Sequence, residues 1–180
     1  PDVAAATYRR LGFRALVGLP VIEFPSAWAR TRDEYFDKAL ALHDDLRGET
    51  LVGTAFAPHA PYTVSNESFA RIHLLADQLD VPVHLHLHET RFEVEDAFAR
   101  LGARPLARIA GLGLLNRSLI AVHMTELNDA EIEHCARAGV SVVHCPESNL
   151  KLASGFCPVA RLLAAGVNVA LGTDGCASNN

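Results

Sequence analysis

The sequence predicts an α/β protein built on a (β/α)8 TIM-type barrel, and two observations lead to this fold. Six short stretches rich in Val, Leu, Ile and Ala alternate with stretches of helical pattern, as in a parallel sheet buried on both faces. Polar residues also follow strand after strand, at His59, His86 with Glu89, His123, His144 and Asp174. A doubly wound sheet would gather its site at one switch point, whereas every strand of a barrel ends at one pocket, so the pattern favours the barrel.

The expected elements are short and evenly spaced. The strands cover residues 14–19, 51–57, 81–88, 119–123, 140–144 and 167–171. The helices cover residues 31–47, 66–79, 129–138 and 158–165, with one or two more between 91 and 112. Residues 145–157 are expected to form a loop.

Local signals support several of these boundaries. Ser65 or Asn66 can cap the helix that begins at 66. Asn128 and Glu131 have the spacing of a capping box, and Gly139 suits the position after that helix. The strands therefore match six of the eight units of a barrel, the third to the eighth, so that the barrel is incomplete.

The strand at 81–88 carries the strongest chemical signal. Alternation places His84, His86 and His88 on one face and the leucines between them on the other. A buried imidazole needs a hydrogen-bond partner or a metal, and Glu89 follows directly. A structural role would suit one such histidine, but the cluster favours a functional site.

Composition limits the class of protein. The chain is 49% hydrophobic and 21% charged, with a net charge of −5 and no basic stripe, which argues against nucleic acid as a partner. No apolar run has the length of a membrane span, and no signal pattern precedes the first strand, so neither a membrane nor export is expected. The four cysteines lack CxxC spacing, which predicts reduced thiols and a cytoplasmic location. The start at Pro1 and the end just after a rich motif predict a piece of a longer protein.

Metal-assisted hydrolysis is the chemistry that these residues indicate. Imidazole and carboxylate suit zinc or iron(II), with His86 and Asp174 as ligands from different strands. Asp174 and Glu89 would serve as base and acid, although Asp174 could instead be a turn residue and His123 a core histidine. Motifs of zinc metalloproteases, cytidine deaminases, serine hydrolases and dinucleotide-binding proteins are absent.

Five separated motifs resemble those of the amidohydrolase superfamily, in its branch of methylthioadenosine/S-adenosylhomocysteine deaminases and triazine hydrolases. The motifs are residues 58–62 (PHAPY), 86–90 (HLHET), His123, 148–152 (SNLKL) and 172–180 (GTDGCASNN). The resemblance covers the whole chain, so residues 1–180 are expected to form one partial barrel.

The resemblance implies a role for each motif. His86 and Asp174 would bind the metal, with Asp174 also moving protons, and Glu89 would donate a proton to a ring nitrogen. His123 would stabilise the attacking hydroxide. Substrate contacts would come from His59, Glu89 and Asp174, and from Ser148 and Asn149 of the pocket loop.

Two family features are missing: the His-x-His pair of the first barrel strand, and a β-sandwich built from the chain ends. Residues 1–180 alone are therefore expected to bind metal poorly and to lack activity. The function expected of the longer protein is zinc- or iron-dependent deamination of 5′-methylthioadenosine, S-adenosylhomocysteine or adenosine, in a homo-oligomer. The alternatives are hydrolysis of a triazine or guanine-type heterocycle, including dechlorination, and a barrel that binds ligand without catalysis.

Overall fold

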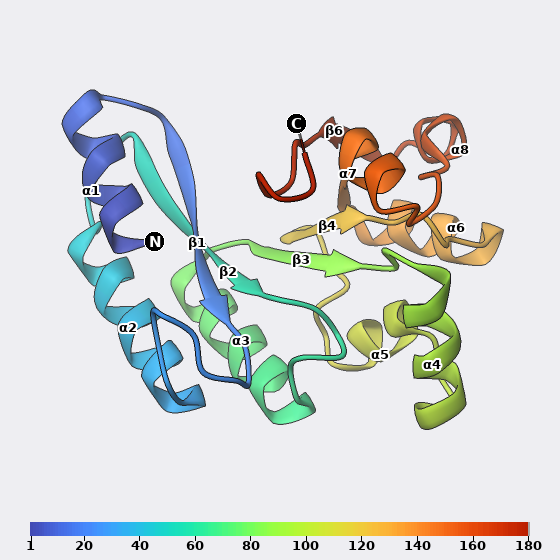
Figure 1. Cartoon of the computed structure of the whole chain (residues 1–180), viewed down its shortest axis with the longest axis horizontal. Helices are drawn as coiled ribbons and strands as arrows, with labels where there is room; N and C mark the ends of the chain where they lie inside the picture. The colour runs from blue at the N-terminus through green and yellow to red at the C-terminus, as the bar shows by residue number, and fades with distance from the viewer. Residues whose placement is uncertain (180) are drawn as a thin grey trace. The chain divides into compact units, whose positions relative to one another are not determined.

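The computed structural model describes residues 1–179, so Asn180, the last residue of the predicted C-terminal motif, lies outside the described residues. The strands are β1 (Ala15–Val21), β2 (Val52–Pro58), β3 (Val83–Leu87), β4 (Leu119–His123), β5 (Ser141–His144) and β6 (Asn168–Leu171) (Figure 1). The helices are α1 (Asp2–Leu11), α2 (Arg32–Asp45), α3 (Asn66–Leu79), α4 (Arg91–Leu101), α5 (Pro105–Gly111), α6 (Asp129–Ala138), α7 (Pro146–Lys151) and α8 (Val159–Ala164).

The strands pair in the order in which they follow along the chain, β1-β2-β3-β4-β5-β6. Pairing is parallel from Ala15 opposite Val52 through Val21 opposite Pro58, and again from β4 to β5 and from β5 to β6. Between β3 and β4 the Met124 amide donates to the Leu87 carbonyl at 3.1 Å. A doubly wound sheet would reverse its order at a switch point, whereas this order runs on as in a barrel. The predicted parallel α/β architecture is confirmed.

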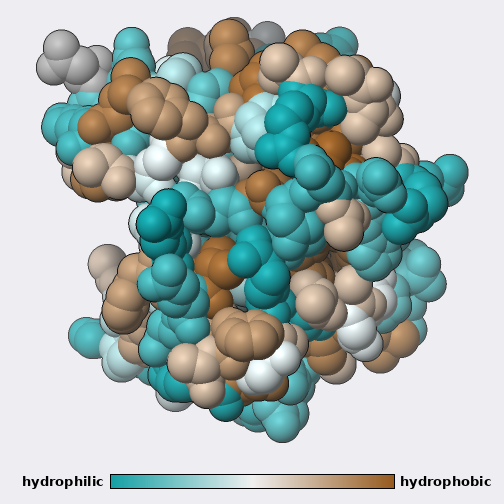
Figure 2. Space-filling view, turned by 90° about the vertical axis from the view of Figure 1, so that its right-hand side faces the viewer, coloured by the Kyte–Doolittle hydropathy of each residue, from teal (hydrophilic) through white to brown (hydrophobic). Residues whose placement is uncertain are grey.

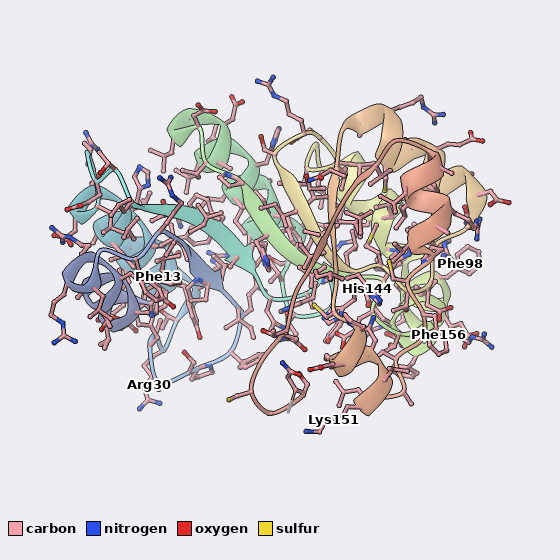
Figure 3. All side chains as sticks on the ribbon, turned by 90° about the horizontal axis from the view of Figure 1, so that it is seen from above. Phe13, Arg30, Phe98, His144, Lys151 and Phe156 are labelled. Atoms are coloured by element: carbon pink, nitrogen blue, oxygen red, sulfur yellow. The ribbon has the colours of Figure 1, made fainter. Side chains whose placement is uncertain are left out.

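The chain divides into two compact units, each with its own core. The first unit comprises residues 1–59 and 63–84, and Leu19, Phe36 and Phe56 are fully buried in it. The second unit comprises residues 60–62 and the chain from Leu85 onward, with Leu85 and Leu119 fully buried. The face drawn in Figure 2 mixes hydrophilic and hydrophobic residues. Exposed aromatic side chains of the second unit include Phe98 on α4 and Phe156 after α7 (Figure 3).

The predicted caps are confirmed. Ser65, rather than Asn66, caps α3 by accepting from the Ser68 amide at 3.2 Å. Asn128 and Glu131 form the full capping box of α6, and Gly139 follows in the left-handed conformation with φ of 72°. These caps satisfy amides that the first turn of a helix leaves without intrahelical partners.

Two local expectations were wrong, and one helix had no counterpart among the expected elements. That helix is α1, although Asp2 in its first turn, Arg9 in its last turn and Gly12 after it are ordinary helix signals. The expected loop 145–157 contains α7, which Pro146 begins because proline suits the first helical position. The third strand ends at Leu87, so His88, with φ of 51°, leaves the alternation assigned to it. None of the helices in residues 1–179 combines the length and apolar character needed to cross a membrane.

Candidate metal centre

The ends of β3, β4 and β6 bring three metal-binding side chains of the second unit together. His86 on β3, His123 at the end of β4 and Asp174 after β6 each offer a ligand atom, and these atoms all lie within 4.8 Å of one another. The two imidazole rings are 5.5 Å apart between centroids. The expected pair His86 and Asp174 thus meets, and His123, expected to stabilise the attacking hydroxide, lies beside them. The roles of the three residues stay predictions.

His123 is held with one ring nitrogen turned to protein and the other to the site. Its side chain is buried, and Nδ1 lies 2.8 Å from the Asn149 amide oxygen. That oxygen only accepts hydrogen bonds, so we assign a proton to Nδ1. Nε2 lies 3.7 Å from a carboxylate oxygen of Glu89. His123 therefore turns Nε2 toward the group expected to act as acid.

Asp174 is stabilised as a carboxylate. Burial acts to raise its pKa, but hydrogen bonds from the Ser148 and Ser178 hydroxyls, both 2.7 Å from Oδ2, outweigh burial and lower the pKa. The Gly175 backbone and the charge of His123 act in the same direction. An ionised Asp174 can bind a cation or accept a proton at neutral pH.

Helix α7 supports the site through two buried polar side chains. Ser148 and Asn149, expected as substrate contacts in a loop, lie buried on this helix, where their side chains bond Asp174 and His123. Contact with substrate stays a prediction for both residues. His144 ends β5 (Figure 3), and burial together with the charge of His123 lowers its pKa.

His88 supports the site and does not join the donor cluster. Its ring is fully buried, and Nε2 accepts from the Leu106 amide at 3.0 Å. Burial lowers the pKa of His88 to about 4, against an opposing effect of Glu131 and with a further lowering by Arg104. A neutral His88 thereby accepts a hydrogen bond from the Leu106 amide, which has no partner within the first turn of α5. This is the structural role that the sequence left open for a single histidine.

His59 lies in the first unit, just after β2. Its backbone amide donates to the Val21 carbonyl at 3.1 Å, and Nδ1 lies 3.0 Å from the Thr63 hydroxyl. The side chain is exposed. Its role in binding substrate stays a prediction.

The donor set fits a zinc or iron(II) ion. Two imidazole nitrogens and one carboxylate oxygen are ligand types that these metals bind. The lowered pKa of Asp174 favours the carboxylate, the form in which this group binds a metal.

Comparisons of the sequence with a family model and with curated proteins point to the same family. The sequence model of the Amidohydrolase family matches residues 2–180. A protein of Saccharophagus degradans named 5-methylthioadenosine/S-adenosylhomocysteine deaminase is 48% identical over 180 residues, which are 100% of this chain and 40% of that protein. One of the same name from Moorella thermoacetica is 53% identical over 133 residues, 74% of this chain and 31% of that protein. The chain spans about 40% of the length of the first of these relatives.

Solved structures agree on the fold. An adenosine deaminase from Xanthomonas campestris, solved with bound zinc, has a TM-score of 0.98 and 65% identity, covering 99% of this chain and 41% of that one. An atrazine chlorohydrolase from Arthrobacter aurescens, complexed with zinc, has a TM-score of 0.90 at 23% identity, covering 99% and 42%. At that identity the second likeness shows the fold alone.

Proposed function

The chain belongs to the amidohydrolase family, and from that premise we propose that this protein is a metal-dependent deaminase of 5′-methylthioadenosine. S-adenosylhomocysteine and adenosine are proposed as related substrates. The reaction consumes one water and converts the exocyclic amino group to a carbonyl oxygen, releasing ammonia and the inosine analogue.

One observation carries the proposal. The ligand atoms of His86, His123 and Asp174 lie within 4.8 Å of one another, with Glu89 3.7 Å from His123 Nε2. A metal-binding cluster beside a carboxylate is what hydrolysis of an amidine C–N bond needs. The names of the deaminase relatives and of the zinc-bound adenosine deaminase support the choice of substrate class.

The proposed division of labour follows from the charges of the site. A bound zinc, or alternatively iron(II), lowers the pKa of water from about 16 to about 7 and so supplies the nucleophile at neutral pH. Glu89 gives a proton to the purine ring nitrogen next to the carbon under attack, and it regains a proton from the hydroxyl group on that carbon as the carbonyl forms. Asp174, held ionised by Ser148 and Ser178, takes the proton from water and passes it to the departing amino group.

The test is ammonia release by the full-length protein from 5′-methylthioadenosine, S-adenosylhomocysteine and adenosine, with metal content measured on the same sample. We expect turnover and about one zinc per chain. Because a general acid contributes about 10²- to 10⁴-fold, Glu89→Gln should lower kcat by at least about 100-fold and leave the zinc content unchanged.

Glu133→Gln is the matched control, since Glu133 is an exposed carboxylate on α6 paired with Arg137. It should leave turnover and zinc unchanged. Loss of zinc in Glu89→Gln would refute the acid role of Glu89. Zinc without ammonia release from any of the three nucleosides would refute the proposed substrate class and favour a triazine or guanine-type substrate, or a barrel that binds ligand without catalysis.

A further inference from the structure

The short segment that carries Glu89 has an unusual backbone. His88 between the end of β3 and Glu89 has φ of 51°, and at the end of β4 both His123 and Met124 also have positive φ, of 75° and 52°. Such conformations are costly for residues other than glycine and persist only where the surroundings hold them. The contacts that hold this segment therefore bear on where the Glu89 side chain lies.

Glu93 holds the amide side of the segment. Its carboxylate accepts from the backbone amide of Glu89 at 2.8 Å and from that of His88 at 3.2 Å. In an ordinary capping box the third helical residue returns to the amide of the capping residue, here Thr90. Thr90 does cap the Glu93 amide, at 3.1 Å, but the Glu93 carboxylate reaches farther back along the chain. Its side chain is 8% exposed, so water competes little for these bonds.

Thr125 holds the carbonyl side. Its hydroxyl lies 2.8 Å from the Glu89 carbonyl oxygen, closer than to the carbonyl of His88 at 3.1 Å, and its backbone amide donates to the His88 carbonyl at 2.9 Å. Thr125 is 8% exposed and follows the positive-φ pair that ends β4. The backbone amide and the carbonyl of Glu89 are thus each held by a buried side chain.

We propose that Glu93 and Thr125 are positioning residues that hold the backbone of Glu89, so that its carboxylate stays directed at His123 and the neighbouring donor groups of His86 and Asp174. This inference rests on the proposed function of Glu89 as the general acid. Fixing both polar groups of one peptide segment limits the rotations that would carry the Glu89 side chain out of reach. Misplacement by about 1 Å can cost about 100-fold in rate.

Helix α2 supplies a natural control for helix capping alone. Its capping residue Thr31 and its third residue Glu34 repeat the Thr-x-x-Glu spacing, and the Glu34 carboxylate accepts from the Arg30 amide at 2.7 Å. Glu34→Gln thus makes the same chemical change in the same local motif, on a helix of the first unit, whereas Glu89 belongs to the second unit.

The experiment uses the full-length zinc protein with Glu93→Gln, Glu34→Gln, Thr125→Val and Thr125→Ser. Glutamine fills the same volume with one acceptor oxygen fewer, and valine removes the hydroxyl that serine keeps. We expect Glu93→Gln and Thr125→Val to lower kcat about 10- to 100-fold, with KM within about threefold and zinc content unchanged. Thr125→Ser should keep most of the rate that Thr125→Val loses, and Glu34→Gln should have the same kcat as the protein without substitutions.

Hydrogen–deuterium exchange of the peptide that covers residues 87–92 gives a readout independent of activity. Faster exchange there in Glu93→Gln and Thr125→Val, but not in Glu34→Gln, is expected. The inference is overturned if Glu89→Gln abolishes turnover while Glu93→Gln and Thr125→Val keep full kcat. It also fails if exchange at 87–92 does not change. If Glu93→Gln fails to fold, the comparison of Thr125→Val with Thr125→Ser decides. If the protein without substitutions releases no ammonia, the proposed function is refuted and not this inference. The exchange measurement then still tests whether Glu93 and Thr125 restrain the backbone of Glu89.

Discussion

Glu93 shows how one buried residue acquires an unusual ionisation. Burial raises the pKa of its carboxyl group to about 7 from an ordinary value of 4.5, and the nearby charge of Glu89 acts in the same direction. The backbone amides of Glu89 and His88 act to lower the pKa but do not outweigh burial. At neutral pH the group is therefore near the midpoint of its titration.

This shift predicts a pH dependence of stability. Between the unfolded pKa of 4.5 and the folded value of about 7, the folded state holds a proton that the unfolded state has lost. The contribution of Glu93 to the free energy of unfolding should therefore fall as pH rises through that window, by up to roughly 3 kcal/mol. Glu93→Gln removes the titration, so its stability relative to the unchanged protein should improve from pH 5 to pH 8 in urea unfolding of the full-length protein. A stability difference between the variant and the original protein that stays constant with pH would contradict the raised pKa of Glu93.

Single residues differ in how far the sequence predicted them. His86 and Asp174 could be assigned as neighbours because each stands at a strand end, where parallel strands gather their side chains. The bond of Asn149 to His123 could not be predicted, because it joins residues 26 positions apart through a helix expected as loop. Glu93 had a local signal, the Thr90-x-x-Glu93 spacing, but its reach back to Glu89 is a tertiary detail.

At the scale of elements, the close packing of β6 against β5 controls where Asp174 lies. The amide of Gly172, just after β6, donates to the His144 carbonyl at 2.9 Å. A Cβ atom at Gly172 would lie 2.8 Å from a methyl group of Val143 and 3.0 Å from the Cys145 sulfur. Valine is stiff about its first side-chain torsion, so the backbone after β6 would have to shift.

Gly172→Ala should therefore displace the segment that carries Asp174. Overpacking of this kind costs about 1 to 3 kcal/mol. We expect lower zinc content and lower turnover in the full-length protein, with a reduced melting temperature. Gly111→Ala, at a position in α5 where an added Cβ meets no atom within 4 Å, should leave zinc content and turnover unchanged and should not lower the melting temperature. Equal zinc content in the two variants would contradict the close packing of Gly172 against Val143 and Cys145.

Helix α6, which has a full capping box, is predicted closely from the sequence, whereas α7, which has no side-chain cap, is not. Helix α6 begins and ends where Asn128 and Gly139 indicate, since both signals act within one turn. Helix α7 is only six residues long, and its buried Ser148 and Asn149 are polar, so no apolar period marks it. Its conformation depends on the contacts of those side chains with Asp174 and His123.

At the scale of the whole molecule, a bound metal would couple strands that lie far apart in sequence. Donors from β3, from β4 and from the segment after β6 meet only in the folded chain. A ligand that binds only the folded state raises stability by RT ln(1 + [L]/Kd), about 2.7 kcal/mol at one hundred times Kd.

Removal of zinc from the full-length protein by a chelator should thus lower the melting temperature and abolish turnover, and added Zn²⁺ should restore both. Asp174→Ala should lose most of this zinc-dependent increase in melting temperature, because it removes one of the three donors. A melting temperature that does not respond to zinc in the unchanged protein would refute a metal site built from these strands.

The sequence by itself determined the parallel α/β fold, the family and the strand ends at which His86, Glu89, His123 and Asp174 stand, because periodicity, caps and short motifs are local properties. The tertiary structure decided that His123 joins His86 and Asp174, that Asn149 accepts a hydrogen bond from the His123 ring, and that Glu93 and Thr125 hold Glu89. These contacts depend on hydrogen bonds between segments distant in the chain, whose partners are set by packing and not by spacing.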